Sequence, residues 1–348
     1  MITPELAAVH ALGTEVHMYA NKKALAYAAA HLPGTEGLNR RLVMFAGTGH
    51  GVELLDAYHQ GAIMACGYDF SPKQIEFARS LAERYLANTQ ATPFWWGNKE
   101  IERLYQHDMA VPMRAHFYVQ SQFQALRRIH GETANDYLIN SPLITWDSLS
   151  GPWPHPKAYD VLVGNFMLHW VVRRTSLERA LDSFAPLVRP GGLAVFTLPF
   201  HLVRLNDEAE DEKLRRHCVY DTAAYHCLHN HLARQFTDSE KMALPWQTSL
   251  RQMPGASVRV SEASHGSVRW RHIATHTEYY ASPYSIMDTL VGLAAYEAVI
   301  RTGKPMYQVL DQVVEALAAT RKTLARTHNL GVSEAATYLY YFVFQQKE

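Results

Sequence analysis

The sequence predicts an α/β fold, in which helices cover both faces of a doubly wound and mainly parallel sheet. Two observations predict it. Short apolar runs alternate with segments of helical periodicity between residues 42 and 200, and this alternation is typical of parallel strands joined by helices. A glycine-rich stretch, GTGHG, directly follows the first apolar run and marks the first strand-to-helix connection.

The first part of the chain supplies a β-α-β-α run. Residues 5–31 predict one or two short amphipathic helices, which LPGTEG interrupts before a strand at 42–46. GVELLDAYHQ has helical spacing, AIMACGYD is a buried strand by its pattern, and SPKQIEFARSLAERYL begins with a Ser-Pro helix start.

An insertion interrupts this rhythm at residues 87–139, where FWW, YQHDM and HFYVQSQFQALRRIH indicate irregular aromatic-rich helix and loop. Strands resume at PLITWD and at YDVLVGNF. The helix SLERALDSFAPLV and the turn and strand RPGGLAVFTLP follow them. The resumed alternation favours a parallel sheet that is covered on both faces.

The C-terminal part is less regular. A charged helix is expected around NDEAEDEKLRRH, a strand near SVRWRHIAT, and helices at roughly 283–302 and 305–327. The tail ATYLYYFVFQ is expected to form the last strand, at an antiparallel edge of the sheet.

The chain shows no internal repeat, low-complexity tract or long linker that would demand two independent domains. We expect a single domain over residues 1–348, with an N-terminal helical lid at 1–40, the insertion at 87–139 and cap or lid helices at 200–330.

Composition limits the classes of partner. Lys plus Arg and Asp plus Glu number 33 each, so the chain lacks the basic field that nucleic acids or anionic membranes attract, and we expect neither partner. No signal-peptide run or stretch of ~20 apolar residues is present, which favours a cytoplasmic protein. The three cysteines suit neither a disulfide framework nor a paired zinc site. The oligomeric state stays open.

The glycine-rich stretch predicts a nucleoside site. Gly47, Thr48, Gly49 and Gly51 lie between a predicted strand and a predicted helix, which directs backbone N–H groups and a helix N-terminus at a ligand. Asp69 ends the next strand about 20 residues on, where a carboxylate can bind both ribose hydroxyls. The ligand could be a dinucleotide or an adenosyl group.

Four segments carry a resemblance to a known family. The glycine stretch, GYDFSPKQIEFAR, YDVLVGNFMLHW and LVRPGGLAVFTLP together resemble class I S-adenosylmethionine (SAM)-dependent methyltransferases, over residues 40–85 and 140–200. The resemblance implies a Rossmann-like sheet and SAM as the cofactor. It also implies that Gly47, Thr48, Gly49 and Gly51 border the adenosine and methionine parts of the cofactor. Asp69 is implied to hold the ribose, Phe70 to flank the adenine and Asp147 to meet the adenine amine. Asn165 and Phe166 would lie beneath the sulfonium, and Tyr19 or Tyr27 would reach the cofactor carboxylate. From the residues alone, Asp147 could instead cap the turn that follows it.

Phe45 departs from the family pattern, which commonly has Asp or Glu two residues before the first glycine to help hold the methionine amine. A phenyl ring cannot accept those hydrogen bonds. Phe45 could simply pack in the core while the amine finds backbone carbonyls or a lid residue. Alternatively, an unanchored amine could attack the γ-carbon of its own chain and close an azetidine ring with release of methylthioadenosine, as a family of cyclases on a methyltransferase-like fold does.

Three residues are catalytic candidates. His169 follows the fourth strand in NFMLHW, where a neutral imidazole could accept a substrate proton, and His201 follows the fifth strand. Tyr280 belongs to a set of aromatic residues that could surround the sulfonium by cation–π attraction. The other members of this set are Trp95, Trp96, Tyr105, Phe117, Tyr118, Tyr279 and Tyr284.

The stretch from His217 to His231 contains several candidate metal ligands, among them His226, Cys227 and His229. No recognised ligand spacing is complete, and methyl transfer from a sulfonium needs no metal, so we expect none.

The resemblance implies a SAM-dependent methyltransferase that acts on a small molecule by SN2 transfer, with the insertion and the C-terminal helices forming a lid over the sulfonium. SAM cyclisation, a non-catalytic SAM-binding protein and, more distantly, an NAD-dependent oxidoreductase stay open as alternatives. The methyl acceptor cannot be read from the sequence.

Overall fold

The computed structural model describes most of the chain: residues 8, 12, 14–34, 37–88, 90–106, 109–134, 143–151, 155–172, 174–217, 227–228, 230–236, 258–285, 291–292, 294–295, 298–299, 302–327 and 334–347. Helices separate most of the first five strands, although no helix is described between the third and the fourth. The α/β fold class that the sequence predicts is therefore confirmed.

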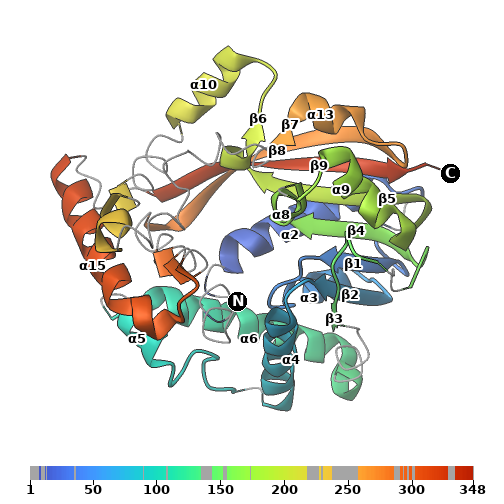
Figure 1. Ribbon diagram of the computed structural model, residues 1–348. Helices are drawn as coiled ribbons and strands as arrows, with labels where there is room; N and C mark the ends of the chain where they lie inside the picture. The colour runs from blue at the N-terminus through green and yellow to red at the C-terminus, as the bar shows by residue number, and fades with distance from the viewer. Residues whose placement is uncertain are drawn as a thin grey trace.

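A seven-stranded sheet forms the centre of the molecule, in the order β3-β2-β1-β4-β5-β9-β8 (Figure 1). Its strands are β1 (Leu42–Ala46), β2 (Met64–Asp69), β3 (Leu143–Thr145), β4 (Tyr159–Asn165), β5 (Val188–Pro199), β8 (Trp270–Ser285) and β9 (Glu334–Gln346), and a second, two-stranded sheet pairs β6 (Val203–Arg204) with β7 (Val258–Arg259). Strands β1 to β5 pair in parallel, whereas β9 runs antiparallel between β5 and β8. The strand order reverses between β1 and β4, so the carboxyl ends of these two strands form the topological switch point, where ligands of such sheets bind.

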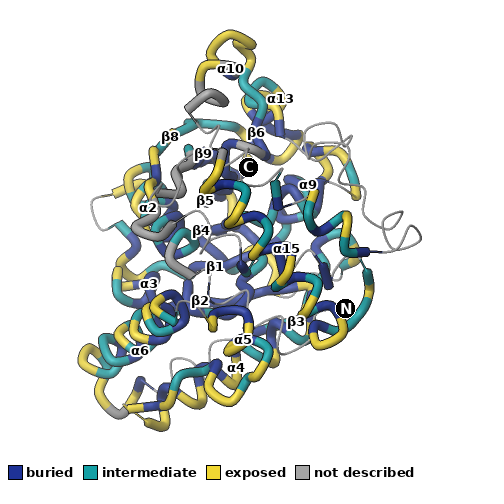
Figure 2. Tube along the Cα trace, turned by 90° about the vertical axis from the view of Figure 1, so that its left-hand side faces the viewer, coloured by how far each residue is buried: buried dark blue, intermediate teal, exposed yellow. Residues whose placement is uncertain are grey.

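Two apolar cores lie on opposite faces of the sheet. Alternate residues of β1 belong to different cores, because successive side chains of a strand point to opposite faces: Val43 and Phe45 belong to one core, Met44 and Ala46 to the other. Figure 2 shows the buried strands at the centre, with exposed residues on the helices around them.

Helices cover both faces. The Phe45 core includes residues of α2 (Thr14–His31), α3 (Glu53–His59), α4 (Pro72–Ala87) and α6 (Ala110–His130), and the Met44 core includes residues of α8 (Leu168–Val172), α9 (Leu177–Phe184) and α13 (Val260–His265). The start of α4 follows from its sequence: the Ser71 hydroxyl accepts a hydrogen bond from the Gln74 N–H, and Pro72 occupies the first helical position.

A third apolar core joins the predicted insertion to the C-terminal part of the chain. It combines Trp95, residues of α5 (Lys99–Leu104) and of the start of α6, Leu228, Leu232 and Phe236, apolar residues within 291–299, and the apolar residues of α15 (Met306–Thr327). Figure 1 shows α5 and α15 on the side toward which β5 runs, beyond the carboxyl ends of the parallel strands. The remaining elements are α10 (Glu208–His217), η1 (Gly131–Thr133), η2 (Ala185–Leu187) and η3 (Phe200–Leu202).

Two details of the sequence prediction are wrong. The tail strand β9 is antiparallel as expected, but it lies between β5 and β8, so β8 and not β9 forms that edge of the sheet. The helix expected from residue 283 cannot begin there, because β8 continues to Ser285. An apolar tail pattern fits an interior strand as well as an edge strand, and the sequence does not reveal which partner covers it.

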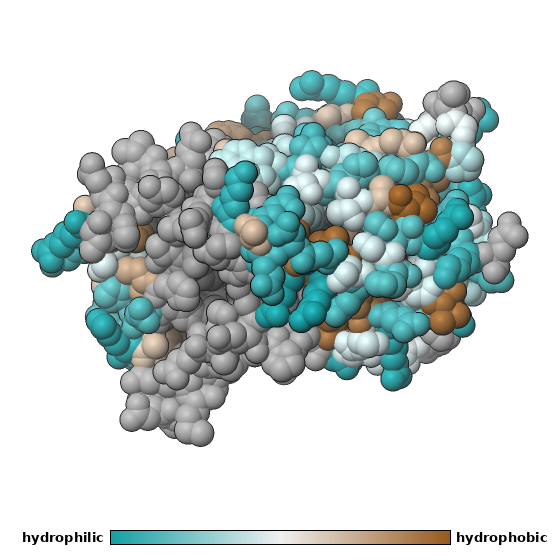
Figure 3. All heavy atoms as spheres, turned by 90° about the horizontal axis from the view of Figure 1, so that it is seen from above, coloured by the Kyte–Doolittle hydropathy of each residue, from teal (hydrophilic) through white to brown (hydrophobic). Residues whose placement is uncertain are grey.

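The outer surface is mixed in character. Figure 3 shows hydrophilic residues interspersed with separate hydrophobic ones over the described part of the upper face. In the described part of the chain, no helix has the length and apolar character that crossing a membrane requires.

Candidate active site

The glycine turn between β1 and α3 is held against the end of β2. The N–H groups of Gly47 and Thr48 both donate to the Tyr68 carbonyl oxygen, at 2.7 and 3.0 Å. Gly47 has a φ of +69°, and a Cβ there would lie 2.7 Å from Cβ of Met167. Only glycine combines this left-handed conformation with such a close approach. The turn therefore brings bare backbone to the carboxyl edge of the sheet.

Asp69 ends β2 and is tied to the same turn. Its Oδ2 accepts a hydrogen bond from the Gly49 N–H at 3.0 Å, and its Oδ1 accepts one from the Ser71 N–H at 2.8 Å. Burial raises the pKa of Asp69, against the lowering effect of these two hydrogen bonds. The carboxylate is thus oriented at the switch-point edge, and each oxygen keeps further acceptor capacity.

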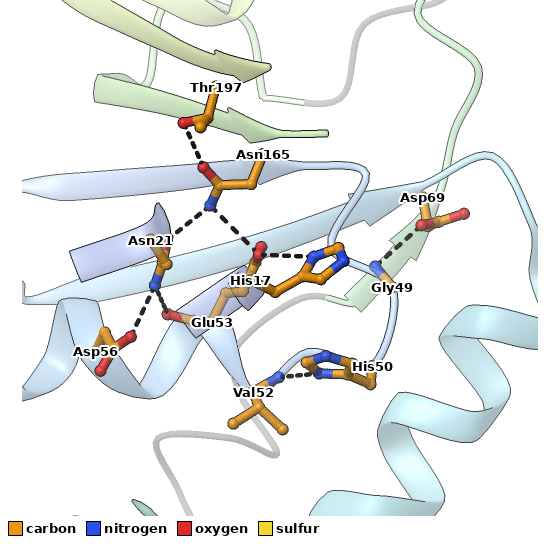
Figure 4. A network of polar contacts seen from close by, with 10 residues as sticks. All are labelled: His17, Asn21, Gly49, His50, Val52, Glu53, Asp56, Asp69, Asn165 and Thr197. Atoms are coloured by element: carbon orange, nitrogen blue, oxygen red, sulfur yellow. Dashed lines mark hydrogen bonds and ion pairs between the residues drawn. The ribbon is translucent and has the colours of Figure 1, made fainter. Parts of the chain in front are cut away.

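A network of polar side chains meets at the carboxyl end of β4 (Figure 4). The Asn165 amide donates to Oδ1 of Asn21 at 3.1 Å and to Oε1 of Glu53 at 3.3 Å, and its Oδ1 accepts from the Thr197 hydroxyl at 2.8 Å. Asn21 in turn donates to the Glu53 carbonyl oxygen and to Oδ2 of Asp56, at 3.1 and 2.9 Å. The network joins α2, α3, β4 and β5 across the switch point.

Two buried acids belong to this network. Burial raises the pKa of Glu53 to about 8, with Asp56 and Asp69 adding to the rise and the Asn165 hydrogen bond opposing it. Burial also raises the pKa of Asp56 to about 6, against the Asn21 hydrogen bond and the charge of Lys22. Near neutral pH, Glu53 therefore holds its proton in the protein as described.

Phe166, directly after β4, has a strained backbone. Its φ is 53°, a left-handed conformation that aromatic residues rarely adopt. Its N–H donates to the Thr197 carbonyl oxygen at 2.9 Å, and its ring makes an edge contact with His17 at 4.7 Å between centroids. Such strain is typical of residues that surround a functional site.

The sequence analysis missed five residues of this region: His17, Asn21, His50, Glu53 and Thr197. The His50 ring lies in the glycine turn, where its Nδ1 accepts from the Val52 N–H at 3.2 Å. Only Glu53 could have been found from the sequence. It lies three positions before Asp56 in the helix ELLDAYH, so two acids share one face of a helix that is otherwise apolar and buried.

Residues 36–243 match the protein family described as Methyltransferase domain. The chain belongs to this methyltransferase family. The sequence matches no curated protein. Similar solved structures include the YcgJ protein of Bacillus subtilis, with 15% identity over 94% of this chain and 98% of that chain and a TM-score of 0.41. A putative sarcosine dimethylglycine methyltransferase from Galdieria sulphuraria has 11% identity over 94% of this chain and 85% of that chain, with a TM-score of 0.39. An S-adenosylmethionine-dependent methyltransferase from Mesorhizobium loti has 15% identity over 51% of this chain and 55% of that chain, with a TM-score of 0.29.

Membership of this family confirms the resemblance to SAM-dependent methyltransferases that the sequence predicts. It also confirms SAM as the cofactor. The described residues fit SAM. Asp69 can still accept bonds from ribose hydroxyls, and the Phe70 side chain is available to an adenine ring because the residue is 60% exposed. The buried Thr48 hydroxyl has no hydrogen-bond partner within the described residues, as expected for a polar atom beside a ligand site.

Asp147 is engaged elsewhere in this methyltransferase. Its two carboxylate oxygens accept from the Arg174 guanidinium at 3.0 and 2.7 Å, and they also accept from the Leu149 N–H and the Ser150 hydroxyl at 3.1 Å each. The Arg174 pairing holds the pKa of Asp147 below its usual value. These contacts are those of the turn-capping alternative, and contact with adenine stays a prediction.

Tyr19 and Tyr27 of α2 contact strand β8. Tyr19 donates to Oε2 of Glu278 at 3.5 Å, and Tyr27 donates to the other carboxylate oxygen of Glu278, on β8. The Tyr19 ring also lies against Tyr280, at 5.0 Å between centroids. Contact of Tyr19 with the cofactor carboxylate stays a prediction.

The three catalytic candidates differ in their surroundings. His169 lies in α8, buried, two residues beyond the Met167 that abuts the glycine turn. His201 lies in η3, directly after β5. Tyr280 belongs to the Phe45 core.

The other members of the predicted aromatic set lie in different surroundings. Trp95 and Tyr105 belong to the third core, and Trp96, Phe117 and Tyr279 are exposed. The Tyr284 side chain lies outside the described residues.

Most of the candidate metal ligands between His217 and His231 lie outside the described residues. His226 and His229 lie outside the described residues. His231 is described, and its Nε2 lies 3.2 Å from the Thr323 hydroxyl. Within the described part of the chain, no group of three His, Cys, Asp or Glu residues is arranged to hold a metal ion.

Phe45 is fully buried among the apolar residues of its core. The core-packing alternative describes these surroundings, and nothing in the comparisons favours cyclisation of SAM.

Proposed function

We propose that this methyltransferase acts on a small molecule, and that the whole chain forms one domain in which the helices around the third core cap the site. The observation that carries the proposal is the position of that core beyond the carboxyl ends of the strands (Figure 1). A cap at the ligand edge encloses the acceptor and excludes water, which suits a compact molecule better than a polymer. The balance of 33 basic and 33 acidic residues also disfavours nucleic acid.

In this proposal, the cofactor lies across the switch point. Main-chain groups of Gly47, Thr48, Gly49 and Gly51 border it, and Asp69 accepts hydrogen bonds from the ribose hydroxyls. Phe70 flanks the adenine at the outer end, while Asn165 and Phe166 lie beneath the sulfonium at the inner end. The turn geometry and the hydrogen bond that ties Gly49 to Asp69 support the assignments of the glycine turn and of Asp69. The assignments of Phe70, Asn165 and Phe166 rest on the family resemblance.

SAM supplies an activated methyl group, so the protein mainly has to align the acceptor and remove its proton. His169 is our proposed base, because it follows β4 at the switch-point edge beside the segment that abuts Gly47. His201 and Tyr280 are the weaker candidates: His201 follows β5, one strand away from the switch point, and Tyr280 packs against Tyr19 in the core.

The first experiment incubates the purified protein with SAM alone and then with a cell extract divided by ultrafiltration into small molecules and macromolecules. Mass spectrometry should find S-adenosylhomocysteine, formed only with the small-molecule fraction. Formation only with macromolecules would overturn the substrate class. Methylthioadenosine from SAM alone, above the spontaneous decay, would overturn methyl transfer itself.

The role of His169 has its own test. His169→Ala should lower kcat with little change in the Kd for SAM, because a base acts on the acceptor and not on the cofactor. Unchanged kcat would give His169 a packing role.

A further inference from the structure

Glu53 is a deeply buried acid at the cofactor edge, and among the described residues only His17 could pair with a negative charge on it. The residue is 3% exposed. Its only ion-pair contact within the described residues is with His17, whose Nδ1 lies 4.0 Å from Oε1. The other titratable groups that act on it are the acids Asp56 on its own helix and Asp69 at the end of β2. Both disfavour a negative charge on Glu53.

The surroundings nevertheless hold the carboxyl in one position. Oε1 accepts a hydrogen bond from the Asn165 amide at 3.3 Å. That amide is fixed on both sides, by Asn21 on α2 and by Thr197 on β5. Asn21 and Thr197 have no exposed surface. Four elements therefore converge to orient one carboxyl group at the switch point, which packing alone does not require (Figure 4).

The cofactor carries two cationic groups, the sulfonium and the ammonium of its methionine part. A sulfonium has no hydrogen to donate, whereas an ammonium offers three donors to a carboxylate. Strand β1 offers no acid to that end of the site, since it ends in Phe45 and Ala46, which belong to the apolar cores.

We propose that Glu53 binds the ammonium group of SAM, with Asn165 as its positioning residue, and that Glu53 releases its proton to solvent when the cofactor binds. The proposal rests on the proposed function. The ammonium keeps its own proton, so each binding event forms one carboxylate–ammonium pair and frees one proton. Burial, which raises the pKa of Glu53 to about 8, is what keeps the carboxyl protonated before that.

Isothermal titration calorimetry with S-adenosylhomocysteine tests this directly. This probe keeps the ammonium but lacks the sulfonium. At pH 6.5, titration in two buffers of different ionisation enthalpy should show release of nearly one proton per molecule bound, and the Kd should tighten roughly tenfold per pH unit up to pH 7.5. This measurement needs only the native chain.

Glu53→Gln keeps an oxygen acceptor for Asn165 but cannot ionise. The variant should bind S-adenosylhomocysteine about 10- to 100-fold more weakly at pH 7.5, with no proton release, while methylthioadenosine, which lacks the ammonium, binds both proteins equally. Asp56→Asn is the matched control, a buried acid one turn along the same helix. It should retain the proton release.

The outcomes separate the two proposals. If the native protein binds S-adenosylhomocysteine without proton release, or if Glu53→Gln binds it equally well, the assignment of Glu53 is overturned and the proposed function stands. Release that disappears in Asp56→Asn but persists in Glu53→Gln also overturns it. If the native protein binds neither SAM nor S-adenosylhomocysteine, the proposed function itself fails.

Discussion

Replacing Glu53 by glutamine should change how the stability of the cofactor-free protein depends on pH. Burial raises the pKa of Glu53 from 4.5 to about 8 in the folded protein. Between these two values the folded state binds one proton more than the unfolded state. The free energy of unfolding therefore falls as the pH rises through this window.

Among the described residues, Glu53 dominates the change in proton binding between pH 6.5 and 8. The pKa of Asp56 is about 6, so Asp56 has already lost most of its proton. The described histidines whose pKa is lowered by burial contribute mainly below their ordinary value of 6.5; they are His59, His116, His130, His231, His272 and His276. One proton is worth about 1.4 kcal/mol per pH unit well below the pKa and less as the pKa is approached, which gives a loss of roughly 1.5 kcal/mol across the interval.

Urea unfolding followed by the fluorescence of the seven tryptophans measures this change. The native protein should lose roughly 1.5 kcal/mol between pH 6.5 and 8, whereas Glu53→Gln should show a nearly flat profile because its amide has no proton to lose. Asp56→Asn should keep the decline in stability but end it at a lower pH, because the charge of Asp56 adds to the rise in the pKa of Glu53. Parallel slopes for the native protein and Glu53→Gln would refute the reasoning, because some other group would then carry the titration.

Three further substitutions test the site and the turn. Asp69→Ala should weaken SAM binding by roughly 1.5–3 kcal/mol through loss of charge-assisted hydrogen bonds, and an unchanged Kd would refute the ribose assignment. Gly47→Ala should lower the free energy of unfolding by roughly 1–3 kcal/mol, because its Cβ would lie 2.7 Å from that of Met167 at a φ of +69°; an unchanged Tm would contradict this. Asp147→Ala should cost about 1 kcal/mol of stability or less, since its pair with Arg174 is partly exposed, and a large loss of SAM affinity would instead support contact with adenine.

The glycine turn and Asp69 could be predicted because their signals are local. A strand, a turn and a helix in sequence place backbone N–H groups at a strand end, and the next strand ends close by because β1 and β2 are paired in parallel. The hydrogen bond between Gly49 and Asp69 follows from that adjacency. The position of β9 could not be predicted in the same way, because strand order depends on which apolar face finds a partner and not on the strand's own pattern.

The polar network could not be predicted because its members are far apart in the chain. Asn21 and Asn165 are separated by 144 residues, and Glu53 and Asn165 by 112. No spacing rule relates such residues, and only the packing of α2 across the ends of β4 and β5 brings them together. Asp147 shows the opposite case, in which a family position suggests one partner and the fold supplies Arg174, 27 residues on.

Phe45 and Glu53 are best understood together. A carboxylate at the end of β1 would join Glu53, Asp56 and Asp69 near one buried site, and like charges at short range raise one another's pKa values and destabilise the folded state. An apolar residue at position 45 leaves a smaller set of acids, of which Glu53 stays neutral until a cation arrives. The cofactor-free protein then avoids an unpaired buried charge, and the cost of ionising Glu53 falls on the binding step, where the ammonium offsets it. The apolar residue at position 45 is therefore the condition under which Glu53 can serve the cofactor site.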